Sequence, residues 1–221
     1  KSISFVPTMG GLHKGHISLI KTAKKYTKET LVSIYVNPKQ FNREKDYKMY
    51  PRNLTKDLKI LKKLKVNYLY LPTYKDLFKF KPSHRIYLHK FSKILCGKYR
   101  KYHFRGVLNV VNRFLEIIRP KYLFLGSKDF QQLTLIKKHV LKNKIHTKII
   151  SCKTVRETNG VACSSRNFNL NKDQMKIAKN VYNYLIEIKK KTKKNFRLFN
   201  FSLFKKNLIK LGVNKIDYIE I

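Results

Sequence analysis

The stretch that decides the fold is Ile3-Ser4-Phe5-Val6-Pro7-Thr8-Met9-Gly10-Gly11-Leu12-His13-Lys14-Gly15-His16. Its apolar start predicts a short buried strand, which we expect Pro7 to end. The three glycines allow a turn in which the backbone lies close to a ligand or adopts a positive φ. Apolar residues then recur at helical spacing, so the two histidines fall on the first turn of a helix. Free N–H groups and the positive end of the helix dipole favour an anion at that point.

His13 and His16 allow three interpretations. Histidines three residues apart can ligate a metal, but a zinc site needs further ligands, and the sequence contains no HExxH or CxxC pattern. The two residues can also be ordinary capping histidines. Strand, glycine turn, HxGH and helix start together resemble the signature of nucleotidyltransferases, which bind ATP phosphates during adenylyl transfer. We therefore favour a phosphate site.

Length and composition limit the class of protein. The 221 residues suffice for one domain of ordinary size and a small appendage. No apolar run reaches the roughly 18 residues that a membrane helix needs, and the first residues are not a signal peptide, so we expect a soluble protein. Three scattered cysteines fit the reducing cytoplasm better than a disulfide framework.

The formal net charge of +39 raises the alternative of a nucleic-acid-binding protein. The excess is mostly lysine, spread along the whole chain together with abundant Asn and Ile, as a strongly AT-biased coding sequence would produce. No RNP-type motif, zinc finger or heptad basic region accompanies it. We expect nonspecific binding to polyanions but no specific nucleic-acid partner.

A second buried strand is expected over residues 31–36, followed by the turn Asn37-Pro38-Lys39-Gln40-Phe41. If this strand and the first are parallel neighbours, Asn37 and Gln40 lie near the histidines, because ligands bind beyond the carboxyl ends of such strands. A neutral amide, which both donates and accepts, suits a hydroxy acid. The alternative is a surface turn with an incidental glutamine.

The next stretch carries fewer signals. We expect a mobile loop over residues 44–51 and then a helix with leucines on one face, capped by Asn53 or Thr55. Asp57 on its first turn either compensates the helix dipole or lies near a magnesium–ATP complex. A third strand is expected over residues 66–71 and a weak one over residues 85–88.

A second glycine turn follows a second strand-to-helix junction. After the segment 99–107 comes a helix whose buried stripe includes Val107, Val111 and Phe114, and then a strand over residues 122–125. The turn Gly126-Ser127-Lys128-Asp129 leads to another helix start. Its lysine can meet a phosphate, and its aspartate can accept hydrogen bonds from ribose hydroxyls.

A third polar block runs from residue 155 to residue 167. Ser164, Ser165 and Arg166 offer hydroxyl and guanidinium donors to a triphosphate. The alternative is an ordinary loop that caps the following helix. Beyond it we expect helices over residues 173–190 and 201–211, and we expect Gly212 to end the second. A strand is expected over residues 215–221. It either docks on the preceding helix or, as we favour, leaves an exposed edge.

Five motifs occur in order: PTMGxLHxGH, SIxVNPxQF, HFRGV, GxKDFQQL and a last segment with xAxSSRN. This set resembles the pantothenate synthetase (pantoate–β-alanine ligase) family. The resemblance implies an α/β fold with a Rossmann-like parallel sheet and helices on both faces over residues 1–170, and a small, incomplete C-terminal α+β domain over residues 171–221. It implies that pantoate and β-alanine are joined through a pantoyl-adenylate, with ATP and Mg²⁺ required and AMP and pyrophosphate released. It also implies a cytoplasmic homodimer.

The resemblance assigns roles to individual residues. His16 is the family's proton donor, and His13, Lys128 and Arg166 complete the catalytic set. Asp57 is a candidate ligand of the magnesium that accompanies ATP. The substrate-binding candidates are Asn37, Gln40, Tyr50, Arg100 and Gln132. The ATP-binding candidates are Met9, Gly10, Gly11, Leu12, His13, Lys14, Gly15, His16, Gly126, Ser127, Lys128, Asp129, Val155, Cys163, Ser164, Ser165 and Arg166.

The sequence departs from the family pattern near these positions. We also expect a short N-terminal lead and the last few dozen residues of the C-terminal domain to be missing. Two alternatives to an active ligase follow: a weakened or incomplete family member, and a basic nucleic-acid-binding protein on the same fold. The departures are Ser127 for Glu, Cys163 for Met, Asn159 for Asp, Cys96 for Glu, Lys56 for an acid, and Arg100-Lys101-Tyr102 for Arg-Pro-Gly.

Overall fold

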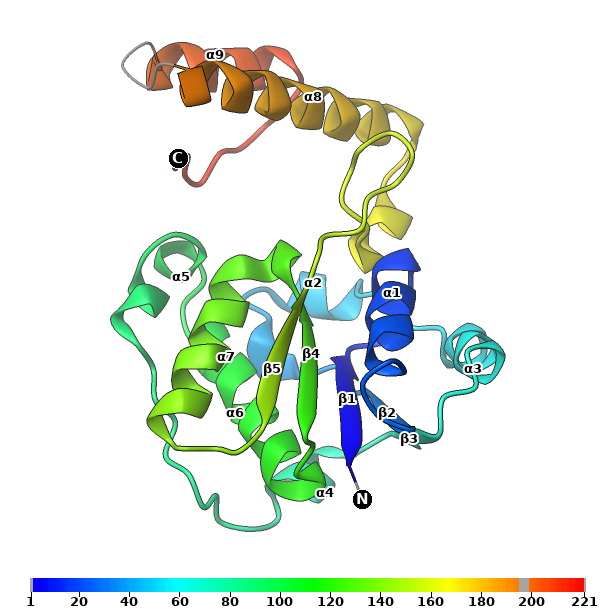
Figure 1. Ribbon diagram of the computed structural model, residues 1–221. Coiled ribbons are helices and arrows are strands. Elements are labelled where there is room, and N and C mark those ends of the chain that lie inside the picture. The colour runs from blue at the N-terminus through cyan, green and yellow to red at the C-terminus, as the bar shows by residue number, and fades with distance from the viewer. Residues whose placement is uncertain (1, 195–198, 221) are drawn as a thin grey trace. The chain divides into compact units, whose positions relative to one another are not determined.

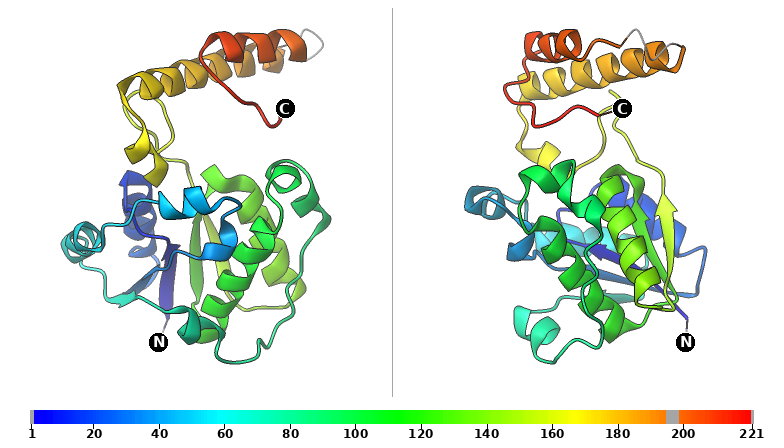
Figure 2. Two further views of the ribbon diagram at one scale, coloured as in Figure 1. Left: turned by 180° about the vertical axis from the view of Figure 1, so that it is seen from behind. Right: turned by 90° about the vertical axis from the view of Figure 1, so that its left-hand side faces the viewer.

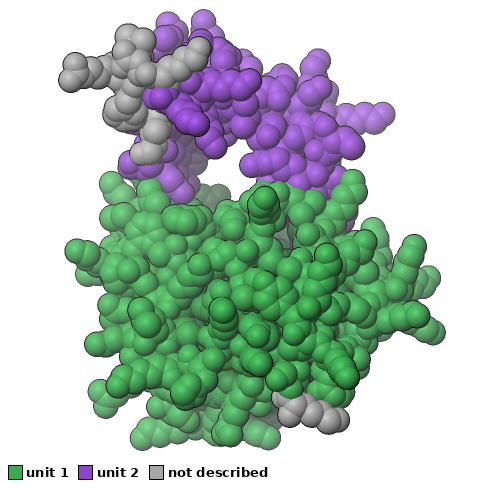
Figure 3. All heavy atoms as spheres, viewed as in Figure 1, with its two compact units in different colours: residues 1–155 green, residues 156–221 purple. Residues whose placement is uncertain are grey.

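A five-stranded parallel sheet forms the centre of the first part of the chain (Figure 1). The structure, a computed structural model, describes residues 2–194 and 199–220. The chain divides into two compact units, residues 1–155 and 156–221, coloured separately in Figure 3. The strands of the first unit lie in the order β3-β2-β1-β4-β5. Their bounds are β1 Ile3–Thr8, β2 Glu29–Ile34, β3 Tyr68–Tyr70, β4 Tyr122–Gly126 and β5 Lys148–Cys152.

The first strand runs through its proline. β1 pairs with β2 over its whole length, and Pro7 stands opposite Ser33. On its other side β1 pairs with β4 only at Ser4 and Phe5. The missing N–H of Pro7 therefore interrupts no ladder on the β4 side. The prediction that Pro7 ends the strand is wrong, because a proline is tolerated beyond the paired part of a ladder, where it removes no hydrogen bond.

Helices cover both faces of the sheet, as predicted (Figures 1 and 2). Alternate residues of a strand point to opposite faces, so Phe5 belongs to one apolar cluster and Val6 to the other. The cluster around Phe5 includes α6 (His103–Ile118) and α7 (Phe130–Lys142). The cluster around Val6 includes α1 (Lys14–Ala23) and α3 (Leu54–Lys63). The predicted stripe of α6 is buried at Val107, Val110, Val111 and Phe114.

The connections hold short elements that were not predicted. Where a mobile loop was expected, α2 (Glu44–Lys48) forms, with acidic residues in its first turn and an ion pair of 2.8 Å between Lys48 Nζ and Glu44 Oε1. The strand β5 was also not predicted. The remaining short elements of this unit are η1 Pro38–Gln40, α4 Tyr74–Phe78, η2 Lys90–Lys93, α5 Cys96–Tyr99 and η3 Ser127–Asp129.

The predicted strand at residues 85–88 is wrong, since no strand forms in this segment of the described chain. Side chains of α6 and α7 take its backbone hydrogen bonds instead. Glu116 Oε1 accepts from the His84 N–H at 3.0 Å, and His139 Nδ1 accepts from the Tyr87 N–H at 3.2 Å. Burial and the nearby His84 lower the pKa of His139 to about 4, so its ring is neutral and able to accept.

The second unit, as far as the structure describes it, consists of helices and one isolated β-bridge between Arg156 and Ala162. Its helices are η4 (Ser165–Asn169), α8 (Lys172–Lys194) and α9 (Phe201–Lys210). Gly212, with a φ of +96°, follows α9 and ends it as predicted. Residues 213–220 form no strand, so the predicted strand at 215–221 is wrong over its described part. None of the described helices combines the length and apolarity that crossing a bilayer requires.

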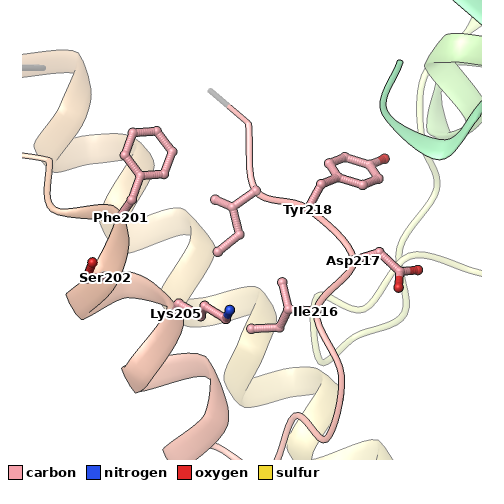
Figure 4. A pocket seen from close by; sticks show the side chains of 7 residues that line it. Phe201, Ser202, Lys205, Ile216, Asp217 and Tyr218 are labelled. Atoms are coloured by element: carbon pink, nitrogen blue, oxygen red, sulfur yellow. The ribbon is translucent and has the colours of Figure 1, made fainter. Parts of the chain in front are cut away.

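The C-terminal segment lies beside α9. A pocket of about 260 Å³ separates the two, and Figure 4 shows Phe201 and Lys205 on one side and Ile216 and Tyr218 on the other. The favoured prediction of an exposed strand edge is therefore wrong over the described part, because this segment forms no strand and lies beside the preceding helix. The pocket contains none of the residues that the motifs single out.

Candidate active site

The sheet order brings two of the motifs to one edge. The chain passes from β1 outward to β2 and β3, and from β4 outward to β5 on the other side. The order therefore reverses between β1 and β4. In open α/β sheets, ligands bind outside the carboxyl ends of the strands at such a reversal. The loops that follow β1 and β4 are the ones that carry the histidines and the Gly-Ser-Lys-Asp turn.

Asp57 holds the glycine turn after β1. Its Oδ2 accepts from the Gly11 N–H at 2.9 Å and its Oδ1 from the Leu12 N–H at 2.8 Å. The residue is only 2% exposed. Gly10 and Gly11 have φ values of +76° and +60°, which L side chains rarely adopt. A Cβ on Gly10 would also lie 3.0 Å from Asp57 Oδ2, so the turn fits closely over the carboxylate.

His13 and His16 lie side by side at the start of α1. His13 is the N-cap, and its Nδ1 accepts from the Gly15 N–H at 3.0 Å. His16 Nδ1 accepts from the His13 N–H at 3.4 Å, and the ring centroids are 4.1 Å apart. A nitrogen that accepts carries no proton, so each neutral ring bears its proton on Nε2. Both side chains thus take part in capping the start of α1, a position that fits an anion site.

The environment keeps His16 neutral. Burial, the neighbouring His13 and the ammonium of Lys128 lower the pKa of His16 from 6.5 to about 3. The contribution of Lys128 means that its charge lies near His16, although the two residues come from different loops. At neutral pH this side of the site therefore combines a neutral imidazole donor with a lysine cation. These two groups can stabilise negative charge on a ligand, and neither needs a change of protonation state to do so.

The turn after β4 leaves its backbone accessible. A Cβ added to Gly126 would meet no atom within 4 Å among the described residues beyond its chain neighbours, so the space beside this residue is open. Ser127, Lys128 and Asp129 form η3, and the last two are exposed. Gln132 lies on the first turn of α7 and is partly buried.

The turn after β2 carries the amides expected to bind substrate. Asn37 is 1% exposed, and its amide binds backbone groups of the protein. Its Nδ2 donates to the Gly106 carbonyl at 3.1 Å, and its Oδ1 accepts from the Lys39 N–H at 3.2 Å. Gln40 ends η1 and is partly buried. Arg100 NH2 lies 3.3 Å from the Gln40 carbonyl oxygen. Tyr50 is buried, with its ring centroid 5.6 Å from that of Phe41.

Two residues with structural roles at this edge received no role from the sequence. His103 Nδ1 lies 2.7 Å from the Gln40 carbonyl oxygen. Gln131, only 7% exposed, donates from Nε2 to the carbonyls of Phe91 and Ile94 at 2.7 and 2.8 Å. His103 stands in a motif already singled out, but no spacing rule assigns its partner.

The third block belongs to the second unit, apart from Val155, which ends the first. Gly160 has a φ of +88°, and a Cβ there would lie 2.1 Å from Tyr182 Cε1. Cys163 is buried and its thiol donates to Glu157 Oε1 at 3.1 Å. Ser164 caps η4 by accepting from the Arg166 N–H, while Ser165 is buried and Arg166 is exposed.

A resident metal site does not fit the residues at this edge. The described residues include no group of three or more His, Cys, Asp and Glu side chains that could hold an ion. Asp57 is buried with both oxygens turned to backbone N–H groups. Magnesium bound to a nucleotide keeps phosphate and water ligands and needs few from the protein. A magnesium ion that accompanies a nucleotide would therefore not depend on a ligand set at this edge.

Comparison with known proteins points to one enzyme family. The family profile described as pantoate-beta-alanine ligase matches residues 1–221. The chain is 44% identical over 192 residues to the pantothenate synthetase of Flavobacterium psychrophilum, covering 86% of this chain and 68% of that protein. It is 38% identical over 224 residues to that of Thermosipho africanus, covering 100% of this chain and 80% of that protein. The crystal structure of the pantoate-beta-alanine ligase of Francisella tularensis, complexed with beta-gamma ATP and beta-alanine, has a TM-score of 0.83, with 41% identity over 96% of this chain and 78% of that one.

Proposed function

The chain belongs to the pantoate-beta-alanine ligase family, which joins pantoate to β-alanine to give pantothenate, and from this premise we propose how its residues carry out the two steps. The carboxylate of pantoate attacks the α-phosphorus of ATP. An oxygen–phosphorus bond forms, the bond to the β-phosphate oxygen breaks, and pyrophosphate leaves. The amine of β-alanine then attacks the acyl carbon, AMP leaves, and the amine loses a proton.

The first step needs positioning and charge stabilisation rather than a nucleophilic side chain. The observation that carries the assignment is the cluster of His13, His16 and Lys128 where the strand order reverses. Two Nε2–H donors and one ammonium suit the charge that develops on the α-phosphate and on the leaving pyrophosphate. Because His16 is neutral, it acts first as a hydrogen-bond donor and becomes an acid only as the phosphate charge grows.

We assign the binding of the nucleotide to residues beside this cluster and to the third polar block. The open space above Gly126 supports its contact with ATP, as does the exposed position of Lys128 and Asp129. We assign phosphate contacts also to Ser164, Ser165 and Arg166 of the second unit, on their donor chemistry and the family pattern. Magnesium enters with ATP. The other nucleotide contacts assigned are Met9, Gly10, Gly11, Leu12, Lys14, Gly15, Ser127, Val155 and Cys163.

Pantoate is assigned to the turn after β2 and to the start of α7. Gln40 and Gln132 supply amides that can both donate and accept, and Arg100 supplies a cation for a carboxylate. Tyr50, which is buried, lines the same region. Asn37 acts differently in this proposal, because its amide already binds Gly106 and Lys39. It holds the turn in place for Gln40.

The two-step reaction predicts the order of product release. Pyrophosphate should appear in a single turnover when enzyme, MgATP and pantoate are mixed without β-alanine, because the acyl-adenylate forms first. Rapid quench with labelled ATP measures this directly. The matched control replaces pantoate by β-alanine and should release none. Release that requires both substrates together would show a concerted reaction and overturn the intermediate.

We also propose a cytoplasmic homodimer, with a second copy covering apolar side chains at the β3 edge. β3 is an edge strand, and near it Leu54, Leu58, Tyr68 and Leu71 are between 41% and 46% exposed. Exposed apolar residues beside an open strand edge favour association. Sedimentation velocity should give a mass of twice 26.4 kDa, and Leu58→Lys should shift it toward the monomer. A monomeric mass for the unchanged chain at micromolar concentration would contradict this.

A further inference from the structure

The carbonyl oxygen of Gln40 is held by the segment that leads into α6. His103 Nδ1 lies 2.7 Å from it and Arg100 NH2 lies 3.3 Å from it. A carbonyl oxygen only accepts, so His103 must carry a proton on Nδ1. This is the opposite tautomer from that of His13 and His16. The contact is well sheltered, because His103 is only 9% exposed.

Other contacts fasten the same two segments together. Asn37 Nδ2 donates to the Gly106 carbonyl at 3.1 Å, and Asn42 Nδ2 donates to the Lys101 carbonyl at 3.1 Å. A Cβ on Gly106 would lie 2.3 Å from the Lys39 carbonyl oxygen, so only glycine allows this approach. The turn from Asn37 to Asn42 is thus attached to the segment 100–106 at both ends and in the middle.

The segment 100–106 is itself rigidly placed. From Phe104 onward, α6 contributes Val107, Leu108 and Val111 to the core against the sheet. A turn fastened to the first residues of a buried helix has little freedom to move. The backbone of Gln40 therefore takes its position from α6, not only from the strand that precedes it.

We propose that His103 is a positioning residue for the reaction: its Nδ1–H fixes the Gln40 carbonyl and thereby directs the Gln40 side-chain amide toward pantoate. This rests on the assignment of pantoate to Gln40 in the proposed function. His103 acts through Gln40 and has no contact of its own with the reacting atoms. Its loss should therefore affect pantoate and leave ATP largely unaffected.

A pair of matched variants tests the inference. In His103→Asn the amide nitrogen can take the place of Nδ1 and keep the donor, whereas in His103→Gln the amide lies near the Nε2 position and the donor to Gln40 is lost. Because small misplacements of a binding group cost one to two powers of ten in rate, we expect kcat/KM for pantoate to fall roughly 10- to 100-fold in His103→Gln. The loss should be mainly in the KM for pantoate, with the KM for ATP changed by less than about twofold. His103→Asn should recover most of it.

Two further variants separate positioning from general destabilisation. Val110→Ala removes two buried methyl groups from the same helix and should lower stability without a selective change in the KM for pantoate. Gly106→Ala should push the turn away from α6 and raise the KM for pantoate as His103→Gln does. If His103→Gln and His103→Asn behave alike, or if Val110→Ala gives the same selective change, the inference is wrong.

Gln40→Ala distinguishes this inference from the proposed function. An unchanged KM for pantoate in Gln40→Ala would overturn the assignment of Gln40 and the inference with it. A raised KM in Gln40→Ala together with a normal KM in His103→Gln would overturn the inference alone. We expect the KM for pantoate to rise in both single variants. The double variant, which combines Gln40→Ala with His103→Gln, should show no further increase, because the two residues act on one contact.

Discussion

Replacing His16 by alanine is expected to lower kcat for pantothenate formation by about 100-fold or more, because a preorganised donor to developing charge is lost. Lys128→Ala should have an effect of the same size for the same reason. Steady-state kinetics with saturating ATP and pantoate measure both. Lys121→Ala is the matched control: this exposed lysine immediately precedes β4, at the opposite end of the strand from Lys128, and its loss should change kcat by less than about twofold.

The pH dependence separates a neutral donor from an ordinary acid. The pKa of His16 is lowered from 6.5 to about 3, so the free enzyme binds no proton there at neutral pH. The loss of activity in His16→Ala should therefore be constant between about pH 5 and pH 8. His16→Gln, whose amide can donate from near the Nε2 position, should recover part of the rate. A wild-type ionisation near 6.5 that disappears in His16→Ala would contradict this account.

The same shift links His16 to stability. A histidine whose folded pKa lies below its unfolded value binds fewer protons when folded. The unfolded state then gains protons first as the pH falls, so this contribution to stability is present above the unfolded value of 6.5 and is lost as the pH falls toward 3. The stability contributed by His16 should therefore fall below about pH 6.5, whereas the activity lost in His16→Ala stays constant down to about pH 5.

Much of the sheet could be predicted because apolar runs and glycine turns are local signals. The strands near residues 3, 31, 68 and 122 follow from apolar runs, and the buried stripe of α6 follows from helical periodicity. The sequence does not predict β5, although Ile149 and Ile150 have strand character. The tolerance of Pro7 within β1 depends on how far β1 pairs with β4, which is a property of the sheet and not of the local sequence.

The loops that follow β1, β2 and β4 could be predicted to share one edge of the sheet, and the strand order agrees, but the partners of their residues could not be predicted. These partners are set by the tertiary structure. Both oxygens of Asp57 accept from backbone N–H groups, the amide of Asn37 donates to Gly106, and His103 contacts the carbonyl of Gln40. The segment 215–220 shows the same limit, since its β-branched residues have strand character but lie beside α9 instead of pairing.

Replacing Asp57 by alanine is expected to lower the free energy of unfolding by about 3 kcal/mol or more, because two backbone N–H groups lose a charged acceptor in a buried place. The glycine turn should then lose its shape, and the KM for ATP should rise, since the turn leads directly into His13. Asp57→Asn should also be destabilising, because an amide accepts with one oxygen and presents N–H to the second donor. Urea unfolding at neutral pH measures the change in the free energy of unfolding.

This prediction also decides between two roles for Asp57. If the carboxylate served mainly as a magnesium ligand, Asp57→Ala would raise the magnesium concentration needed for activity and leave the unfolding free energy nearly unchanged. If it holds the turn, stability falls in metal-free buffer as well, and the magnesium requirement stays that of MgATP. Asp173→Ala removes an exposed carboxylate and should cost less than about 1 kcal/mol. The contacts to Gly11 and Leu12 favour the turn-holding role, because both carboxylate oxygens already have donors at hydrogen-bond distance.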